Sequence, residues 1–81
     1  MKRIGRDRFL RNVLIAIGNS GDAALAEEAR RLLDDASPLV RGAAVWALGQ
    51  LVTRDAFDAM KSAAMSGEHD ESVREEWQAA L

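Results

Sequence analysis

Apolar residues recur along this chain at helical spacing, and the most apolar stretch covers residues 37–51. Within it only Arg41 and Gln50 are charged or carry a side-chain amide, so we expect a helix that is buried on all sides. Ser37 suits the N-cap, and Pro38 suits the first helical position because its missing N–H costs nothing there. The sequence therefore predicts the central helix of a layered all-α domain, with other helices packed on both of its sides.

Four further amphipathic helices are predicted, two before the central helix and two after it. In the first, Phe9 belongs to the apolar face and Gly18 is expected to stop the helix. Residues with capping side chains, Asp22, Thr53 and Asp70, stand where the later helices should begin. The expected turns lie near residues 18–22, 35–37, 52–54 and 66–70.

The helical pattern repeats along the chain. Phe9, Val40 and Val73 open three equivalent helices at spacings of 31 and 33 residues, and Ile17, Leu48 and Leu81 close them at the same spacings. A period of this size is typical of helical solenoids, in which each hairpin buries its inner face on the next. The sequence predicts about five helices, which amount to two and a half helical hairpins in a single domain over residues 1–81.

Composition narrows the possible functions. The chain has 81 residues and no run of eighteen apolar residues, so we expect a single small cytoplasmic domain without a membrane span or signal peptide. It has no cysteine, and His69 is its single histidine. Thiolate catalysis, cysteine-held clusters and multi-histidine metal sites are thereby excluded, and we expect neither a catalytic residue nor a bound cofactor in this chain.

Charge is distributed unevenly along the chain. Residues 1–11 carry five basic side chains against one acidic side chain, Asp7, a net charge of +4. The remaining residues carry six basic and twelve acidic side chains, a net charge of −6. Only the amino-terminal end is therefore expected to attract a polyanion.

Two resemblances to known families follow from specific motifs. Residues 39–51 read LVRGAAVWALGQL and resemble the first helix of a HEAT-like repeat, in which a Val-Arg pair opens an alanine-rich helix ending in Ala-Leu-Gly. A more particular match is carried by the runs KRIGRDRFLRNVLIAIGNSGD and LLDDASPLVRGAAVWALGQL. Over roughly residues 2–52 the chain resembles the C-terminal HEAT-like region of the epoxyqueuosine reductases. These are iron–sulfur proteins that use cobalamin in the last step of making queuosine in transfer RNA.

The resemblance carries over only in part. In that family the clusters are held by cysteine runs upstream of the helical repeats, and this chain has no cysteine, so neither clusters nor reaction can be assigned to it. What the resemblance implies is the C-terminal part of a larger tRNA-modifying enzyme. An upstream cysteine-rich catalytic domain would hold the iron–sulfur clusters and cobalamin, and the present chain would help to engage tRNA.

Candidate tRNA contacts are the basic residues of the first helix. Arginines on one helix end can follow a phosphate backbone by charge and by forked hydrogen bonds, whereas the simpler interpretation is a solvated face. No stacking aromatic is expected among them because Phe9 is assigned to the buried face, which argues against recognition of single-stranded bases. The predicted nucleic-acid-binding residues are Arg3, Arg6, Arg8, Arg11 and Asn12.

Structural roles are predicted for four other residues. Arg41 is expected to pair with Asp34 or Asp35 in the preceding turn and to tie one repeat to the next. Trp46 and Trp77 are expected in the core or between repeats. Two functional classes remain at this point: a tRNA-assisting module of a modifying enzyme, or a protein-interaction scaffold that uses the concave surface of the solenoid.

Overall fold

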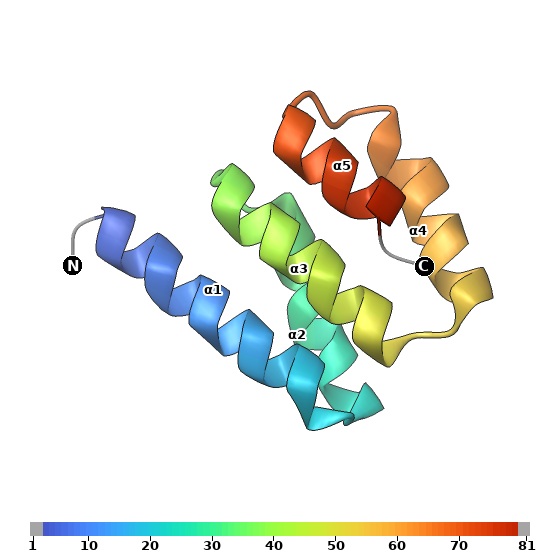
Figure 1. Cartoon of the computed structure of the whole chain (residues 1–81), viewed down its shortest axis with the longest axis horizontal. Coiled ribbons are helices and arrows are strands. Elements are labelled where there is room, and N and C mark those ends of the chain that lie inside the picture. The colour runs from blue at the N-terminus through green and yellow to red at the C-terminus, as the bar shows by residue number, and fades with distance from the viewer. Residues whose placement is uncertain (1–2, 80–81) are drawn as a thin grey trace.

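The computed structural model describes residues 3–79, and all of its regular elements there are helices (Figure 1). The side chain of Arg3, like residues 1, 2, 80 and 81, lies outside the described part. The helices confirm the all-α prediction. They are α1 (Arg3–Ser20), α2 (Ala26–Arg31) with short 3₁₀ turns η1 (Ala23–Leu25) and η2 (Leu32–Asp34) at its ends, α3 (Pro38–Leu51), α4 (Arg54–Met65) and α5 (Glu71–Ala79).

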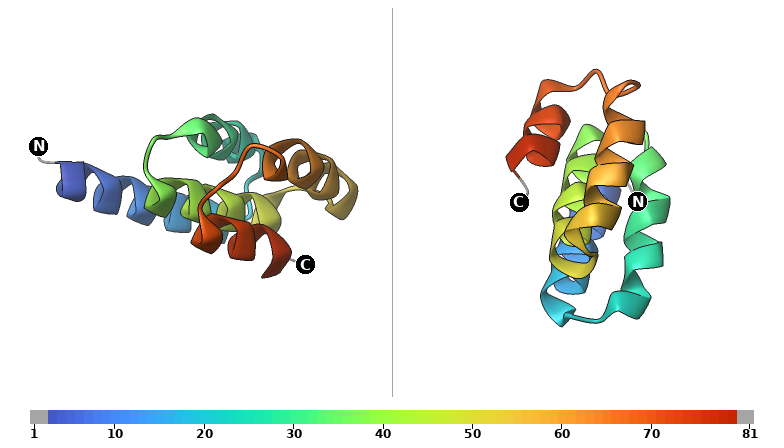
Figure 2. Two further views of the ribbon diagram at one scale, coloured as in Figure 1. Left: turned by 90° about the horizontal axis from the view of Figure 1, so that it is seen from above. Right: turned by 90° about the vertical axis from the view of Figure 1, so that its right-hand side faces the viewer.

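The helices form two layers. α1, α3 and α5 lie side by side and run in the same direction, and α2 and α4 lie on one side of them (Figures 1 and 2). α3 packs against all four other helices, most extensively against α1 and α5. The predicted central helix and the hairpin repeat are therefore confirmed.

The core lies between the two layers. α3 contributes the largest share, because its residues Val40, Ala44, Val45, Ala47 and Leu48 are fully buried. The neighbouring helices each supply a few residues at helical spacing, which is how amphipathic helices close a shared core. These are Leu14 and Ile17 of α1, Ala29 of α2, Phe57 of α4, and Val73 and Trp77 of α5.

Three of the four expected caps are present. Asp22 accepts from the amide of Ala24, Thr53 accepts from Ala56, and Asp70 accepts from the amides of Ser72 and Val73. Ser37 stands at the N-cap of α3, but its hydroxyl makes no capping hydrogen bond. Its amide instead donates to a carboxylate oxygen of Asp35 at 3.0 Å, so this turn is held by Asp35.

Gly18 does not end the first helix as predicted. α1 continues to Ser20, and the turn is made by Gly21, which has a φ of 68°. Gly18 is buried, and a Cβ added to it would overlap Cζ3 of Trp46. The absence of a side chain at Gly18 therefore lets the indole of α3 lie directly against the backbone of α1.

The prediction that α3 is buried on all sides is wrong. Leu39 is 46% exposed, and Trp46 is only partly buried. The reason lies in the layering: α1 and α5 flank α3, and α2 and α4 cover one side of it, but no described helix covers the other side. Phe9, predicted on the buried face of α1, is likewise 58% exposed.

Candidate functional site

The predicted nucleic-acid-binding residues lie on the outer surface of α1. Arg6, Arg8, Arg11 and Asn12 are all exposed, while Leu14 and Ile17 of the same helix face the core. Arg3 belongs to α1, but its side chain lies outside the described residues. Four of the five predicted residues are therefore accessible to solvent on α1.

Arg6 differs from its neighbours because it is held by two carboxylates. Its guanidinium donates to both oxygens of Asp35, at 2.5 and 3.3 Å, and to Asp7 at 2.9 Å. The hydrogen bond to Asp35 is the main cause that raises the pKa of Arg6 above its ordinary value. Arg6 therefore fastens α1 to the turn before α3, and its charge is already partly neutralised.

Arg8 and Arg11 carry the available positive charge of this surface. Both are exposed, and neither forms an ion pair or hydrogen bond with a side chain in the part of the chain that the structure describes. They stand one helical turn apart, with the exposed ring of Phe9 between them in sequence. Arginines in this state can neutralise phosphates without first breaking an internal ion pair.

A groove of about 470 Å³ adjoins this surface on the side of α3 that no described helix covers. Its floor consists of the apolar and small residues of α3, with Trp46 among them. Arg11 stands on the α1 rim and Glu76 on the α5 rim. The full lining is Arg11, Ile15, Asn19, Pro38, Leu39, Gly42, Ala43, Trp46, Ser72 and Glu76.

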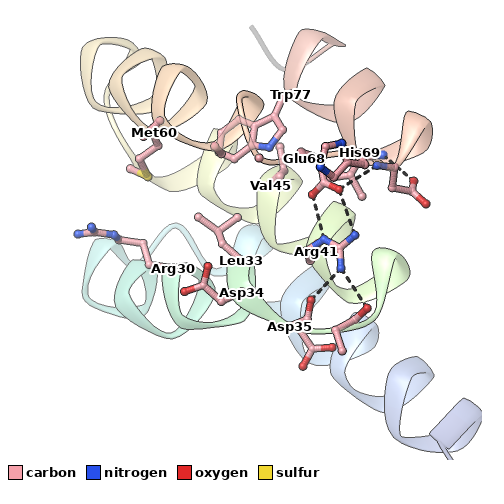
Figure 3. Close-up of a pocket in the computed structure, with 16 residues that line it drawn as sticks. Arg30, Leu33, Asp34, Asp35, Arg41, Val45, Met60, Glu68, His69 and Trp77 are labelled. Atoms are coloured by element: carbon pink, nitrogen blue, oxygen red, sulfur yellow. Dashed lines mark hydrogen bonds and ion pairs between the residues drawn. The ribbon is translucent and has the colours of Figure 1, made fainter.

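Arg41 joins two turns at the other side of the molecule (Figure 3). Its guanidinium donates to both carboxylate oxygens of Glu68, at 2.9 and 3.0 Å, and to the backbone carbonyls of Asp35 and Ala36, at 2.9 and 3.0 Å. The predicted link to the preceding turn is thus made to the backbone of Asp35. The carboxylate partner is Glu68, in the turn between α4 and α5, and not Asp34 or Asp35 as predicted.

The Arg41–Glu68 pair is largely shielded from solvent. The side chains are 19% and 10% exposed, and Glu68 also accepts from the amide of Asp70 at 3.1 Å. The hydrogen bonds from Arg41 lower the pKa of Glu68, although burial opposes them, and Glu68 in turn raises the pKa of Arg41. Both groups are therefore charged at neutral pH and lock the turn before α5 onto α3.

The same arrangement recurs one repeat later, which sequence analysis missed. Asp35 and Glu68 stand 33 residues apart, each two residues before the N-cap of the next helix, and each accepts from that cap's amide. Arg74, 33 residues after Arg41, donates to the carbonyls of Met65 and Glu68 at 2.9 and 3.0 Å. Aligning the two repeats at this spacing makes Glu68 the equivalent of Asp35 and Arg74 the equivalent of Arg41.

A second hollow, of about 770 Å³, separates the α2 and α4 hairpins and ends at the Arg41–Glu68 pair (Figure 3). Leu33, Met60 and Trp77 give it apolar walls. Within the described residues no group of three or more His, Cys, Asp or Glu side chains is placed to hold a metal ion. With no cysteine in the chain, the residues present do not fit an iron–sulfur cluster.

The two tryptophans have different surroundings. Trp77 is 1% exposed and packs against Phe57 with ring centroids 5.0 Å apart and ring planes tilted by 45°. This confirms the predicted core position of Trp77. Trp46 packs on α1 at Gly18, which confirms a contact between repeats, but it also lines the open groove.

Comparison with known protein families shows what the chain is similar to. A family model described as HEAT repeats matches residues 6–81, nearly the whole chain. No curated protein and no solved structure matches the chain. No helix in the described part is both long and apolar enough to span a membrane.

Proposed function

This chain belongs to the HEAT-repeat family, and we propose that it is a non-catalytic repeat module that helps a larger tRNA-modifying enzyme to engage its tRNA. The larger enzyme would be similar to the epoxyqueuosine reductases, act in the cytoplasm, and hold its iron–sulfur clusters and cobalamin in an upstream cysteine-rich domain. The present chain would contribute binding surface and no reacting group.

The observation that carries this proposal is the state of Arg8 and Arg11. Both are exposed and have no ion-pair partner among the described residues. They lie at the one positively charged end of a chain whose residues 12–81 carry a net charge of −6. A polyanion would therefore be attracted to α1 and repelled elsewhere, which orients the chain on RNA.

The exposure of Phe9 removes an objection raised by the sequence. The sequence places Phe9 on the apolar face of the first helix and so predicts no stacking aromatic among the arginines. Phe9 is instead 58% exposed beside Arg8. Exposed aromatic side chains next to arginines are the common means by which proteins hold unstacked RNA bases.

The tRNA affinities of charge-reversal variants in α1 and, as a control, in α2 test the proposal. Arg8→Glu with Arg11→Glu and the matched control Arg30→Glu with Arg31→Glu change the net charge equally, and all four residues are exposed. We expect the α1 pair to weaken tRNA binding by about tenfold or more and to reduce the log–log salt slope by about 1.5, as for two lost phosphate contacts. The control pair on α2 should change affinity much less. Equal effects from both pairs would refute a specific role for α1.

A protein-binding scaffold is the second candidate, favoured by the exposed apolar side chains of Ile4, Phe9 and Leu39, which are 70%, 58% and 46% exposed. Apolar surface of this kind is common at protein interfaces. The scaffold becomes the preferred function if the two charge-reversal pairs change the affinity for tRNA by the same amount.

A further inference from the structure

The groove on the uncovered side of α3 combines three different chemistries. Its floor holds the partly exposed indole of Trp46, its α1 rim holds Arg11, and its α5 rim holds Glu76. The side chains of Arg11 and Glu76 form no hydrogen bond or ion pair in the described part of the molecule, and the indole of Trp46 packs on Gly18 and the core beneath it. An aromatic side chain between a cation and a carboxylate offers a ligand a stacking surface, an attractive charge and a hydrogen-bond acceptor in one place.

We propose that this groove binds one unpaired nucleotide of an RNA, with the base on Trp46, the phosphate at Arg11 and an amino group of the base at Glu76. The proposal rests on the function proposed above and adds to it a site for a single-stranded nucleotide, which arginines on a helix surface alone would not provide.

The floor of the groove suits a flat ring. Gly42 and Ala43 add little side-chain volume beside Trp46, and Leu39 extends the apolar surface. Gly18 fixes the indole from below, because the benzene ring of Trp46 rests where a Cβ would otherwise be. A base stacked on an indole typically gains affinity of about five- to a hundredfold, and the gain depends little on which base is bound.

The charged rims fix the direction in which a nucleotide can lie. A phosphate is attracted to Arg11 and repelled by Glu76, so it must lie on the α1 side. Arg8, one turn earlier on α1, is free to take the neighbouring phosphate. The base edge then faces α5, where Glu76 can accept a hydrogen bond from an exocyclic amino group such as N4 of cytosine. The Ser72 hydroxyl donates to Asp70, so its oxygen can act there only as a further acceptor. Uracil lacks an amino group and should bind less well.

An amphipathic helix of a protein partner is the competing occupant. It would use the apolar floor equally well, but it would not require an unpaired arginine on the α1 rim with a second one, Arg8, one helical turn earlier. Two unpaired arginines one helical turn apart on α1, one of them beside an aromatic side chain, suit the repeated negative charge of a nucleic-acid strand, and this favours the nucleotide.

The test compares a short RNA stem-loop with a fully paired RNA duplex of the same stem sequence, each titrated against the 81-residue chain. We expect the stem-loop to bind about tenfold more tightly than the duplex and to quench Trp46 fluorescence. Trp46→Leu should abolish this preference, and Trp46→Phe, which keeps an aromatic platform, should retain most of it. Glu76→Gln should reduce the preference for cytosine-rich over uracil-rich loops. Circular dichroism melting of each variant confirms that it folds.

Each outcome distinguishes this inference from the proposed function. Equal binding of stem-loop and duplex, or a loop preference that survives Trp46→Leu, would overturn the nucleotide site while leaving the role of Arg8 and Arg11 intact. Failure of both RNAs to bind would overturn both proposals. A protein ligand that quenches Trp46 in the absence of RNA would assign the groove to a protein partner.

Discussion

The two tryptophans show how one residue type can serve the fold in one place and remain available for binding in another. Trp77 is 1% exposed between the two helical layers, against Phe57 of α4. Trp46 packs on Gly18 of α1 and lines a groove formed by residues of α1, α3 and α5. Position relative to the layers, and not the apolar character of the surrounding helix, decides whether such a side chain stabilises the fold or is left open to a ligand.

The largest effect is expected when Trp77 is shortened. Trp77→Ala should cost about 3–5 kcal/mol, because it removes a large side chain from a closed core and leaves a cavity. A domain of this size is stabilised by only about 4–12 kcal/mol, so partial or complete unfolding should follow. Urea denaturation followed by circular dichroism measures the loss. A variant that melts within a degree or two of the parent would show that Trp77 is not a core residue.

The second-largest loss of stability is expected when the Arg41–Glu68 ion pair between the repeats is broken. Glu68→Gln removes the charge partner of Arg41 in a largely shielded site and should cost about 1–3 kcal/mol at pH 7. The folded-state pKa of Glu68 lies below its ordinary value of 4.5. Its stabilising contribution is therefore complete above that value and is lost as the pH falls through the lower folded pKa.

The pH dependence of the urea midpoint provides a separate test of this prediction. Urea midpoints of the parent and of Glu68→Gln should differ most at neutral pH and converge at acidic pH, since Glu68 is then protonated in the parent as well. A gap that stays constant with pH would mean that the Arg41–Glu68 charge interaction does not stabilise the fold.

The effect of Gly18→Ala on the free energy of unfolding should change sign when Trp46 is replaced. In the parent, Gly18→Ala introduces a Cβ that overlaps the indole, and we expect a net loss of about 1 kcal/mol. In a Trp46→Leu background the overlap is gone, and the higher helix propensity of alanine should instead stabilise the fold by about 1 kcal/mol. A double-mutant cycle measures both values. The same loss in both backgrounds would show that Gly18 serves some purpose other than making room for Trp46.

The smallest effect on stability is expected at the rim of the groove. Arg11→Ala should change the free energy of unfolding by less than about 0.5 kcal/mol, because Arg11 is exposed and has no ion-pair partner among the described residues. A loss above 1 kcal/mol in urea denaturation would indicate a structural role for Arg11 and weaken its assignment to ligand binding.

The sequence predicted the helices well because local signals mark them. Caps at Asp22, Thr53 and Asp70 and the repeat of Val40 at Val73 place the helices to within a few residues of their observed ends. These features depend on neighbours in the chain and on helical period alone, so they can be read without knowledge of the tertiary arrangement.

The candidate site was predicted less well because it depends on which faces the layers leave uncovered. Periodicity placed Phe9 and Trp46 on apolar stripes, but it does not say whether another helix covers each stripe. The partner of Arg41 was missed for a related reason, because Glu68 lies in a turn 27 residues away. Arg6 was predicted to bind RNA for the same reason, because its ion pair with Asp35 is a long-range contact that the sequence pattern does not reveal.

The most direct test of the account uses the two indole N–H groups as separate probes in ¹H–¹⁵N spectra of the chain titrated with tRNA. If RNA binds the α1–α3–α5 face, the indole signal of Trp46 and the amide signals of Arg8 and Arg11 should shift, whereas the indole signal of Trp77, enclosed between the layers, should stay in place. A shift of the Trp77 signal with Trp46 unchanged, or tRNA binding that moves none of these signals, would contradict the account.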